Sequence, residues 1–220
     1  MRSIQVHGHR GARAVMPENS LAGFEYAIGV GVDAIEMDVH ARDGVVVVKH
    51  DPPRPGEDLP TLDEVLSLAR LGDFLFNIEA KVHGHTPENL ADLVLARIHA
   101  HGLESRVIFQ SFDFAILHRM RKLAPAITQA ALWEGAQRSF VDIARDAETE
   151  IVAPEYVLVT EPEVRAAHEA GLQVIPWTPN AVDDWKRLIA AGVDGIITDN
   201  PAGLIRYVQA ETEAPVQQIE

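Results

Sequence analysis

The chain has 220 residues, of which 47% are hydrophobic and 24% are charged, and this composition and length fit one globular domain with a real core. Its formal net charge of −14 argues against a nucleic acid or an anionic membrane surface as partner, because both are bound through basic patches. It contains no cysteine, which excludes a disulfide framework, a thiolate metal site and a cysteine nucleophile.

The first strand-like run begins at Ile4, which leaves no room for a secretion signal, and no stretch reaches about 18 apolar residues. We therefore expect a cytoplasmic protein without stable membrane association. The sequence does not indicate an oligomeric state. An anionic small-molecule substrate would need a local positive field, which a bound cation and a few cationic side chains can supply.

Short runs rich in valine, isoleucine and phenylalanine alternate with longer amphipathic runs, as in βα units around a parallel sheet. The eight predicted strands cover residues 4–9, 33–39, 74–81, 106–111, 127–133, 150–154, 173–178 and 195–198. The eight predicted helices cover residues 20–30, 61–70, 87–101, 114–123, 137–147, 161–170, 182–190 and 201–208. This alternation predicts an α/β fold, a (β/α)8 TIM barrel in a single domain over residues 1–210, and a flexible tail over residues 211–220.

Residues 45–48 form one more strand-like run, which lies outside the count of eight. The preceding Asp43-Gly44 pair is a strong hairpin signal between strand-like segments. We therefore expect a short β-ribbon after the second strand. Its return would bring His50 back to the rim of the barrel, near the residues that end the second strand.

Ionisable residues gather at the ends of three neighbouring predicted strands and of the ribbon. The active site of a (β/α)8 barrel lies at the C-terminal ends of its strands, so such residues are candidates for function. Strand side chains alternate between faces, which places Glu36 and Asp38 on one face and pairs Glu79 with Lys81. The candidates are His9, Arg10, Glu36, Asp38, His50, Glu79 and Lys81.

Three converging carboxylates need a counter-charge, and a hard divalent cation with oxygen ligands supplies one. Glu36, Asp38 and Glu79 therefore predict a site for Mg²⁺ or Ca²⁺. The alternative is a structural web in which these carboxylates pair with Arg10 and Lys81. Two histidines beside such a site, His9 and His50, suggest a general acid and a general base.

The order and spacing of these motifs resemble the glycerophosphodiester phosphodiesterase family. The resemblance extends over almost the whole chain and continues beyond the third strand. Its motifs are His9-Arg10-Gly11, Pro17-Glu18-Asn19-Ser20, Glu36-Met37-Asp38-Val39, Asp43-Gly44, His50-Asp51, Glu79-Ala80-Lys81, Ser111-Phe112, Trp177-Thr178 and Thr198-Asp199-Asn200-Pro201.

The resemblance implies a barrel enzyme that cleaves glycerophosphodiesters to glycerol 3-phosphate and an alcohol. It implies a divalent metal on Glu36, Asp38 and Glu79, and it makes His9 and His50 the catalytic acid and base, without assigning which is which. By the same resemblance, three residues contact the substrate: Arg10 and Lys81 bind the phosphate, and Trp177 lines the glycerol side of the pocket. The glycerol 2-hydroxyl would be the first nucleophile and would give a cyclic phosphate.

The chain departs from the family pattern after His50-Asp51. Many members carry an Arg-Thr-Thr stretch and an inserted capping domain there, whereas this chain has residues 52–60 and then the helix predicted from Thr61. We therefore expect no capping domain and an open mouth. Selectivity for the alcohol portion should be loose, and neither the preferred alcohol nor the choice between Mg²⁺ and Ca²⁺ follows from the sequence.

Three other functions compete with this interpretation. His7-Gly8-His9 also resembles the metal motif of amidohydrolase-type barrels, but residues 127–133 and 150–154 lack the further histidines that such a site needs. His7 is better explained as a hydrogen-bonded core histidine. A lysophospholipase D would need an interfacial helix, which is not evident, and a non-catalytic barrel would have lost part of the motif set, which is complete.

Several other residues near the motifs have structural interpretations. His83 and His85 follow Lys81 on a loop and could add ligands or contact substrate, although loop histidines are more often solvated. We expect Glu18 to hold Arg10 or its loop, with Asn19 or Ser20 capping the helix that follows. Two further aromatic residues, Trp133 and Trp185, are expected to contribute packing.

Overall fold

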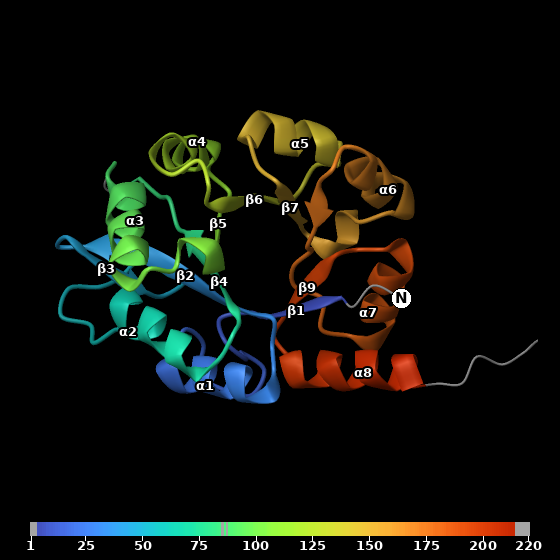
Figure 1. Ribbon diagram of the computed structural model, residues 1–220, viewed down its shortest axis with the longest axis horizontal. Helices are drawn as coiled ribbons and strands as arrows, with labels where there is room; N and C mark the ends of the chain where they lie inside the picture. Colours follow the sequence, from blue (N-terminus) through green and yellow to red (C-terminus); the bar gives the residue numbers. More distant parts are fainter. Residues whose placement is uncertain (1–3, 85, 87, 214–220) are drawn as a thin grey trace, which may run out of the picture.

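Strands and helices alternate along the computed structural model, which describes residues 4–84, 86 and 88–213 (Figure 1). The strands are β1 (Gln5–Gly8), β2 (Ala34–Arg42), β3 (Val45–Val48), β4 (Leu75–Ala80), β5 (Val107–Ser111), β6 (Thr128–Trp133), β7 (Ile151–Pro154), β8 (Gln173–Val174) and β9 (Gly195–Thr198). The α-helices are α1 (Leu21–Val30), α2 (Leu62–Leu66), α3 (Leu90–His101), α4 (Phe114–Leu123), α5 (Phe140–Ala147), α6 (Glu161–Glu169), α7 (Val182–Ala191) and α8 (Pro201–Glu213).

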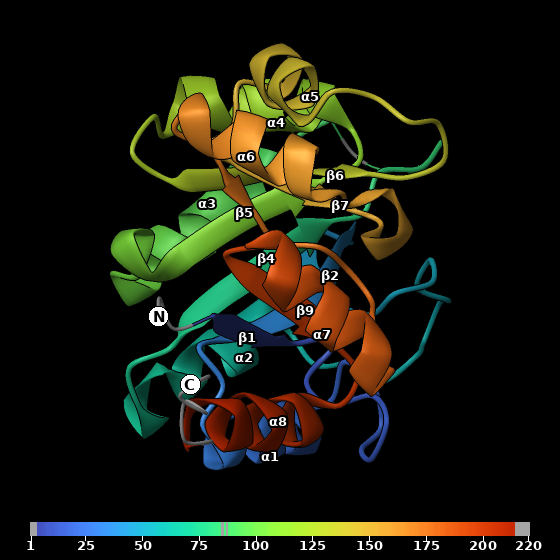
Figure 2. The same ribbon diagram turned by 90° about the vertical axis from the view of Figure 1, so that its right-hand side faces the viewer.

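Eight of the strands form a parallel sheet in the order β8-β7-β6-β5-β4-β2-β1-β9. The two ends of this order meet where Trp177, just beyond β8, bridges to Ile197 of β9. Backbone hydrogen bonds strengthen the junction: Ile197 N donates to Pro176 O at 2.9 Å, and Asp194 N donates to Val174 O at 2.9 Å. The predicted (β/α)8 barrel is therefore confirmed, and α8 lies beside α1 where the chain returns to its start (Figure 2).

The extra ribbon is confirmed as well. Strand β3 pairs antiparallel with β2, from Arg42 opposite Val45 to Val39 opposite Val48, and it projects from the side of the barrel in Figure 1. Asp43 and Gly44 have φ of 52° and 79°, and two positive values in succession are what a type I′ turn requires. Beyond β3, the chain passes through residues 51–60 to α2.

Most boundaries agree with the prediction, and the differences have local causes. The strand predicted over residues 173–178 contains only two residues as β8, because Pro176 has no N–H to donate to a ladder. The helix predicted over residues 61–70 ends at Leu66 and continues as a 3₁₀ helix, Ser67–Leu71. At this junction the Ser67 hydroxyl donates to Glu64 O at 2.6 Å, a side-chain bond that competes with the helical pattern of the backbone. Short 3₁₀ helices also occur at Glu104–Arg106 and Tyr156–Leu158.

At the other termini, α3 begins at Leu90, and Pro87, where we expected it to start, lies outside the described residues. Helix α8 extends to Glu213, so the first residues of the expected tail are helical, and residues 214–220 lie outside the described part of the chain. No helix within the described residues is long and apolar enough to cross a membrane.

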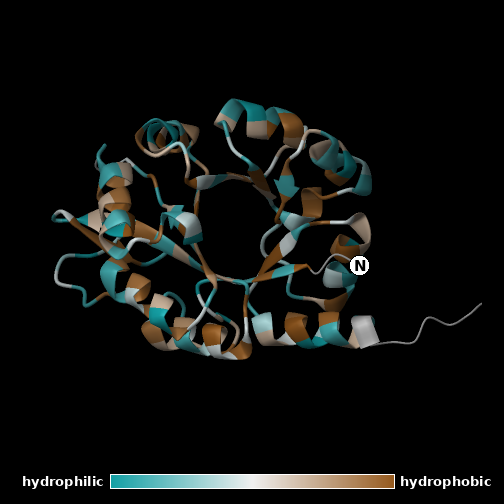
Figure 3. Ribbon diagram, in the orientation of Figure 1, coloured by the Kyte–Doolittle hydropathy of each residue, from teal (hydrophilic) through white to brown (hydrophobic). Residues whose placement is uncertain are grey.

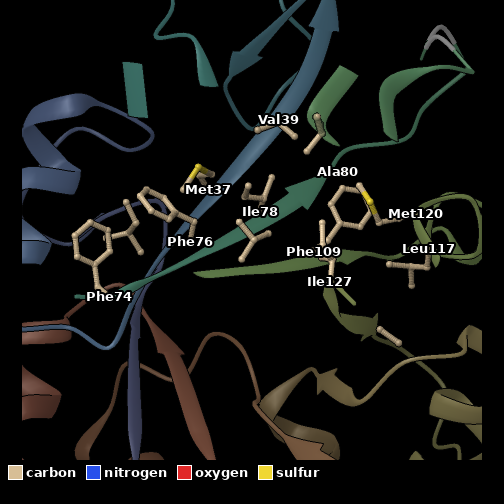
Figure 4. Close-up of a cluster of buried hydrophobic side chains, with 14 of the residues drawn as sticks. Met37, Val39, Phe74, Phe76, Ile78, Ala80, Phe109, Leu117, Met120 and Ile127 are labelled. Carbon is tan, nitrogen blue, oxygen red and sulfur yellow. The ribbon is translucent and has the colours of Figure 1, made fainter. Parts of the chain in front are cut away.

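The core has two layers because strand side chains alternate between faces. Inside the barrel, a small cluster of apolar side chains comes from β5, β6, β7, β9 and the segment after β8. Outside, a larger cluster lies between the strands and the helices, which carry both hydrophobic and hydrophilic residues along their length (Figure 3). In Figure 4, Phe109 of β5 lies next to Met120 of α4 in this outer layer.

Phe109→Ala is expected to lower the free energy of unfolding by about 3–5 kcal/mol, since it removes a fully buried ring and leaves a cavity between β5 and α4. Denaturant unfolding followed by circular dichroism measures this change. Val157→Ala is the control, because Val157 is 57% exposed and its truncation should stay within about 0.5 kcal/mol of the wild type. Equal effects of the two variants would contradict the assignment of the core.

Candidate active site

The three predicted metal ligands meet at the C-terminal mouth of the barrel. Glu36 and Asp38 occupy alternate positions of β2, and β4 pairs beside β2 with Glu79 opposite Asp38. All three side chains are buried, and one oxygen from each lies within 4.8 Å of the other two. The convergence expected from strand alternation is therefore present.

Two cationic side chains lie among these carboxylates. Arg10 Nε is 3.1 Å from Asp38 Oδ2, and Lys81 Nζ is 2.8 Å from Glu79 Oε1 and 3.5 Å from Asp38 Oδ1. Glu36 instead accepts a hydrogen bond from the backbone N–H of Arg10 at 2.8 Å. Part of the predicted salt-bridge web thus exists, but two cations face three buried carboxylates.

The surplus of negative charge shifts the pKa values of the carboxyls. Burial, with repulsion from Asp38, raises the pKa of Glu79 to about 7. Burial and the two neighbouring carboxylates raise the pKa of Glu36 well above its usual value. Burial also acts to raise the pKa of Asp38, but Arg10 and Lys81 outweigh it and the pKa is lowered. These raised pKa values favour the protonated forms of Glu36 and Glu79, and a bound cation would displace those protons.

The donor set fits a hard divalent cation. Asp38 Oδ1 is buried and makes no hydrogen bond among the described residues, although Lys81 Nζ lies 3.5 Å away, so this oxygen can still serve as a ligand. Oxygen ligands without nitrogen or sulfur suit Mg²⁺ or Ca²⁺ better than Zn²⁺. The observed arrangement can therefore hold a cation of this class at Glu36, Asp38 and Glu79.

The loop after β1 supports the triad from the other side. Asn19 Nδ2 donates to Asp38 Oδ2 at 2.7 Å, and Asn19 Oδ1 accepts from Asp38 N at 3.2 Å. Sequence reasoning considered Asn19 only as a helix cap, whereas Ser20 caps α1 through its side chain. Glu18 has the expected holding role, since it accepts from Arg10 NH1 at 2.9 Å and pairs with Arg13 Nε at 2.8 Å.

His9 is oriented by a carboxylate that the sequence reasoning did not assign. Its Nδ1 lies 2.6 Å from Oδ1 of Asp199, which follows β9. Asp199 is fixed in turn by Asn180, whose Nδ2 donates to Asp199 Oδ2 at 2.8 Å and whose Oδ1 accepts from Asp199 N at 2.9 Å. A carboxylate can only accept here, so Nδ1 carries the proton and Nε2 is left for chemistry, 4.0 Å from Glu36.

His50 reaches the same mouth through the ribbon. Lys49 N donates to Asp38 O at 2.9 Å, which ties the segment after β3 to the middle of β2, beside the carboxylates. His50 Nδ1 lies 2.9 Å from Asp51 Oδ1, so its Nε2 is also left for chemistry. The His50 side chain is 36% exposed, against 12% for His9, and sits at the rim.

These side chains line one cavity of about 410 Å³ at the mouth. One side is polar and carries His9, His50, Arg10 and Lys81 beside two of the carboxylates. The other side is mainly apolar. It includes Phe112, Leu132, Ile197 and Trp177, with Glu134 at the edge.

Trp177 is held firmly in that apolar wall. Its Nε1 donates to Ala153 O at 2.9 Å, and its ring meets Phe112 edge-to-face at 5.5 Å between centroids. The predicted substrate residues Arg10, Lys81 and Trp177 therefore face the same cavity as the two histidines. Phe112 belongs to the Ser111-Phe112 motif, for which the sequence predicts no role.

The remaining histidines divide into a core residue and loop residues. His7 is fully buried in the barrel, bonded to Gln5 and Asn77, and burial lowers its pKa to about 4. It is the core histidine that we expected. His83 contacts His40, with 3.3 Å between His83 Nε2 and His40 Nδ1, and His85 lies outside the described residues.

Trp133 and Trp185 are packing residues, as expected. Trp185 is 3% exposed, its ring contacts Tyr207 of α8, and its Nε1 donates to Pro179 O at 2.9 Å. Trp133 packs against the outer core layer and is covered by Arg138, whose guanidinium lies 5.4 Å from the ring centroid.

Comparison with known proteins identifies the family. The model of the glycerophosphoryl diester phosphodiesterase family matches residues 9–69 and 52–203. A glycerophosphodiester phosphodiesterase of Caldanaerobacter subterraneus subsp. tengcongensis is 31% identical over 93% of this chain and 97% of its own length.

Solved structures agree with the assignment. A Silicibacter pomeroyi protein, provisionally named a glycerophosphoryl diester phosphodiesterase, has a TM-score of 0.88 at 28% identity and covers 96% of this chain and 95% of its own. An Oleispira antarctica phosphodiesterase, solved with the product sn-glycerol-3-phosphate, shares the fold with a TM-score of 0.80 at 21% identity, over 93% of this chain and 96% of its own. The chain belongs to the glycerophosphoryl diester phosphodiesterase family.

Proposed function

We propose that this chain hydrolyses glycerophosphodiesters to glycerol 3-phosphate and an alcohol, with His9 and His50 as the general acid and base. The observation that carries the proposal is that, among the described residues, neither histidine uses its Nε2 in a hydrogen bond, and both line a cavity together with Glu36 and Glu79 of the buried carboxylate triad. The product bound by the Oleispira antarctica relative supports this substrate class.

Glu36, Asp38 and Glu79 would hold Mg²⁺ or Ca²⁺. When bound, the ion would polarise a phosphoryl oxygen and offset the charge that grows on it. Arg10 and Lys81 contact further phosphate oxygens from the same side of the cavity. Trp177 packs against the carbon skeleton of the glycerol, which leaves the phosphorus near both histidines.

In the first step, one histidine removes the proton from the glycerol 2-hydroxyl, whose oxygen attacks phosphorus. The bond from phosphorus to the leaving alcohol breaks, and the other histidine protonates the alcohol oxygen. In the second step the histidines exchange roles: one removes a proton from water, whose oxygen attacks phosphorus, and the other protonates the glycerol 2-oxygen as its bond to phosphorus breaks. This second step gives glycerol 3-phosphate and returns both histidines to their starting protonation states.

The loop between β3 and α2 bears on specificity. Residues 51–60 are short and are held by Glu57, which pairs with Lys49 at 2.7 Å and accepts from Arg42 through its backbone oxygen at 2.8 Å. No capping domain is inserted in this loop. We therefore expect diesters of several small alcohols to be turned over, and we expect no requirement for a lipid surface.

The decisive test uses protein stripped with chelator. Glycerophosphocholine, glycerophosphoethanolamine, bis(p-nitrophenyl) phosphate and a lysophospholipid are each offered with Mg²⁺ or Ca²⁺. Glycerol 3-phosphate, p-nitrophenol and the alcohol released from the lysophospholipid are measured. Release of glycerol 3-phosphate that needs the cation is the expected result. Turnover of a lysophospholipid in preference to all three would favour the lysophospholipase D alternative, and no product with any substrate would refute the proposal.

The pKa values predict that cation affinity rises with pH. The raised pKa values of Glu36 and Glu79, about 7 for Glu79, favour their protonated forms when no cation is bound. The cation binds the ionised carboxylates, so affinity should fall as pH decreases through 7. Isothermal titration calorimetry in buffers of different ionisation enthalpy should detect proton release on binding near pH 7. An affinity that is constant between pH 6 and 8 would contradict this picture.

A further inference from the structure

His40 is a buried histidine beside the proposed site that the mechanism above does not use. It follows Glu36 and Asp38 by the same two-residue step along β2, so its side chain lies on the same face, one position closer to the rim. It is 2% exposed. Its Nε2 lies 3.0 Å from His50 O, and its Nδ1 lies 3.3 Å from His83 Nε2.

These contacts determine the tautomer of His40. The carbonyl oxygen of His50 can only accept, so Nε2 of His40 carries the hydrogen and donates it. In the neutral ring Nδ1 is then bare, and it accepts from Nε2–H of His83. The result is a directional chain of hydrogen bonds that runs from His83 through His40 to the backbone of His50, with the two imidazole rings 5.3 Å apart.

The backbone of His50 has few other supports. The ladder between β2 and β3 ends at the pair of Val39 and Val48, and Lys49 N is the last group after it to bond to β2. Among the described residues, the hydrogen bond from His40 is the only one made to the backbone of His50. The His50 side chain is half-exposed and bonds only to its neighbour Asp51.

We propose that His40 is a positioning residue that holds the backbone of His50, and so its Nε2, at the mouth of the barrel. This inference rests on the proposed function, because it assigns a role that acts through His50. His83 contributes by fixing the tautomer of His40. A residue that holds a catalytic group in place affects the rate of the chemical step more than the binding of substrate.

The test compares three substitutions of His40 with one remote control. Glutamine places an amide N–H near the position of imidazole Nε2, whereas asparagine is too short to reach the carbonyl and alanine has no donor. His40→Ala and His40→Asn are expected to lower kcat by about 10- to 100-fold with KM within about twofold. His40→Gln should recover most of kcat, and His83→Ala should cause a smaller loss than His40→Ala.

His118→Ala is the matched control. His118 of α4 also donates from Nε2 to a backbone carbonyl, that of Asp146 at 2.9 Å, but it lies on the outer helices. It should leave kcat and KM unchanged. Melting temperature and cation affinity are recorded for every variant, because a role limited to stability would lower the melting temperature without the split between kcat and KM and without rescue by glutamine.

Nitrogen-15 NMR of labelled histidine gives an independent readout. The resonances of His40, assigned by their loss in His40→Gln, should report a neutral ring protonated at Nε2. A ring protonated at Nδ1, or a His40→Ala variant with wild-type kcat, would overturn the inference. An inactive wild type would instead refute the proposed function, and the NMR result would still decide whether His40 donates to His50.

Discussion

Replacing His9 or His50 by alanine is expected to lower kcat by about a hundredfold to ten-thousandfold, which is the range that a positioned general acid or base contributes. Both histidines line the cavity, and among the described residues the lining has no third histidine that could replace the one removed. Steady-state assays of glycerol 3-phosphate release at saturating substrate and cation measure the loss. KM should change little, because the phosphate contacts proposed for Arg10 and Lys81 would remain.

Two controls separate a chemical role from a structural one. Cation affinity should stay close to that of the wild type, since His9 and His50 are not ligands in this arrangement. Asp199→Asn should also lower kcat. The asparagine side chain has a single acceptor oxygen, for which His9 and Asn180 would compete, so the tautomer of His9 would no longer be fixed. In the His9→Ala background the same substitution should add little, as Asp199 acts through His9. Wild-type turnover by either alanine variant would remove that histidine from the mechanism.

The parts of the site that follow local rules could be predicted from the sequence. Alternation along β2 and β4 was sufficient to place Glu36, Asp38 and Glu79 on one face of the barrel. The Asp43-Gly44 turn was sufficient to bring His50 back to the rim. Continuing the alternation by one more step would have pointed to His40, so in that case a signal was present in the sequence.

Contacts between segments distant in the chain were missed. Asp199 orients His9 across 190 positions, which requires β9 to lie beside β1 when the barrel closes. Strand periodicity does not give the side chain that will meet a histidine at that junction. Asn19 was missed for a related reason, since a helix-cap pattern explained it locally while its amide actually bonds Asp38.

Glu36→Ala is expected to abolish measurable cation binding. In the wild type, three buried carboxyls face two cationic side chains, so once their protons are released one negative charge is left for an added ion to neutralise. Without Glu36, Asp38 and Glu79 are balanced by Arg10 and Lys81, so the ion loses both a ligand and the charge that attracts it. Calorimetric titration with Mg²⁺ and Ca²⁺ measures the affinity directly.

Thermal unfolding distinguishes this outcome from misfolding. A cation that binds only the folded state stabilises the wild type by about 2.7 kcal/mol at 100 times its Kd, whereas the melting temperature of Glu36→Ala should not respond to cation. In the absence of cation the variant should still unfold cooperatively, because relief of carboxyl repulsion offsets part of the loss of the hydrogen bond that Glu36 accepts from Arg10 N. Glu134→Gln is the matched control, since Glu134 lines the same cavity outside the triad and its loss should leave the cation-induced shift intact. Cation binding by Glu36→Ala with wild-type affinity would show that other residues hold the ion.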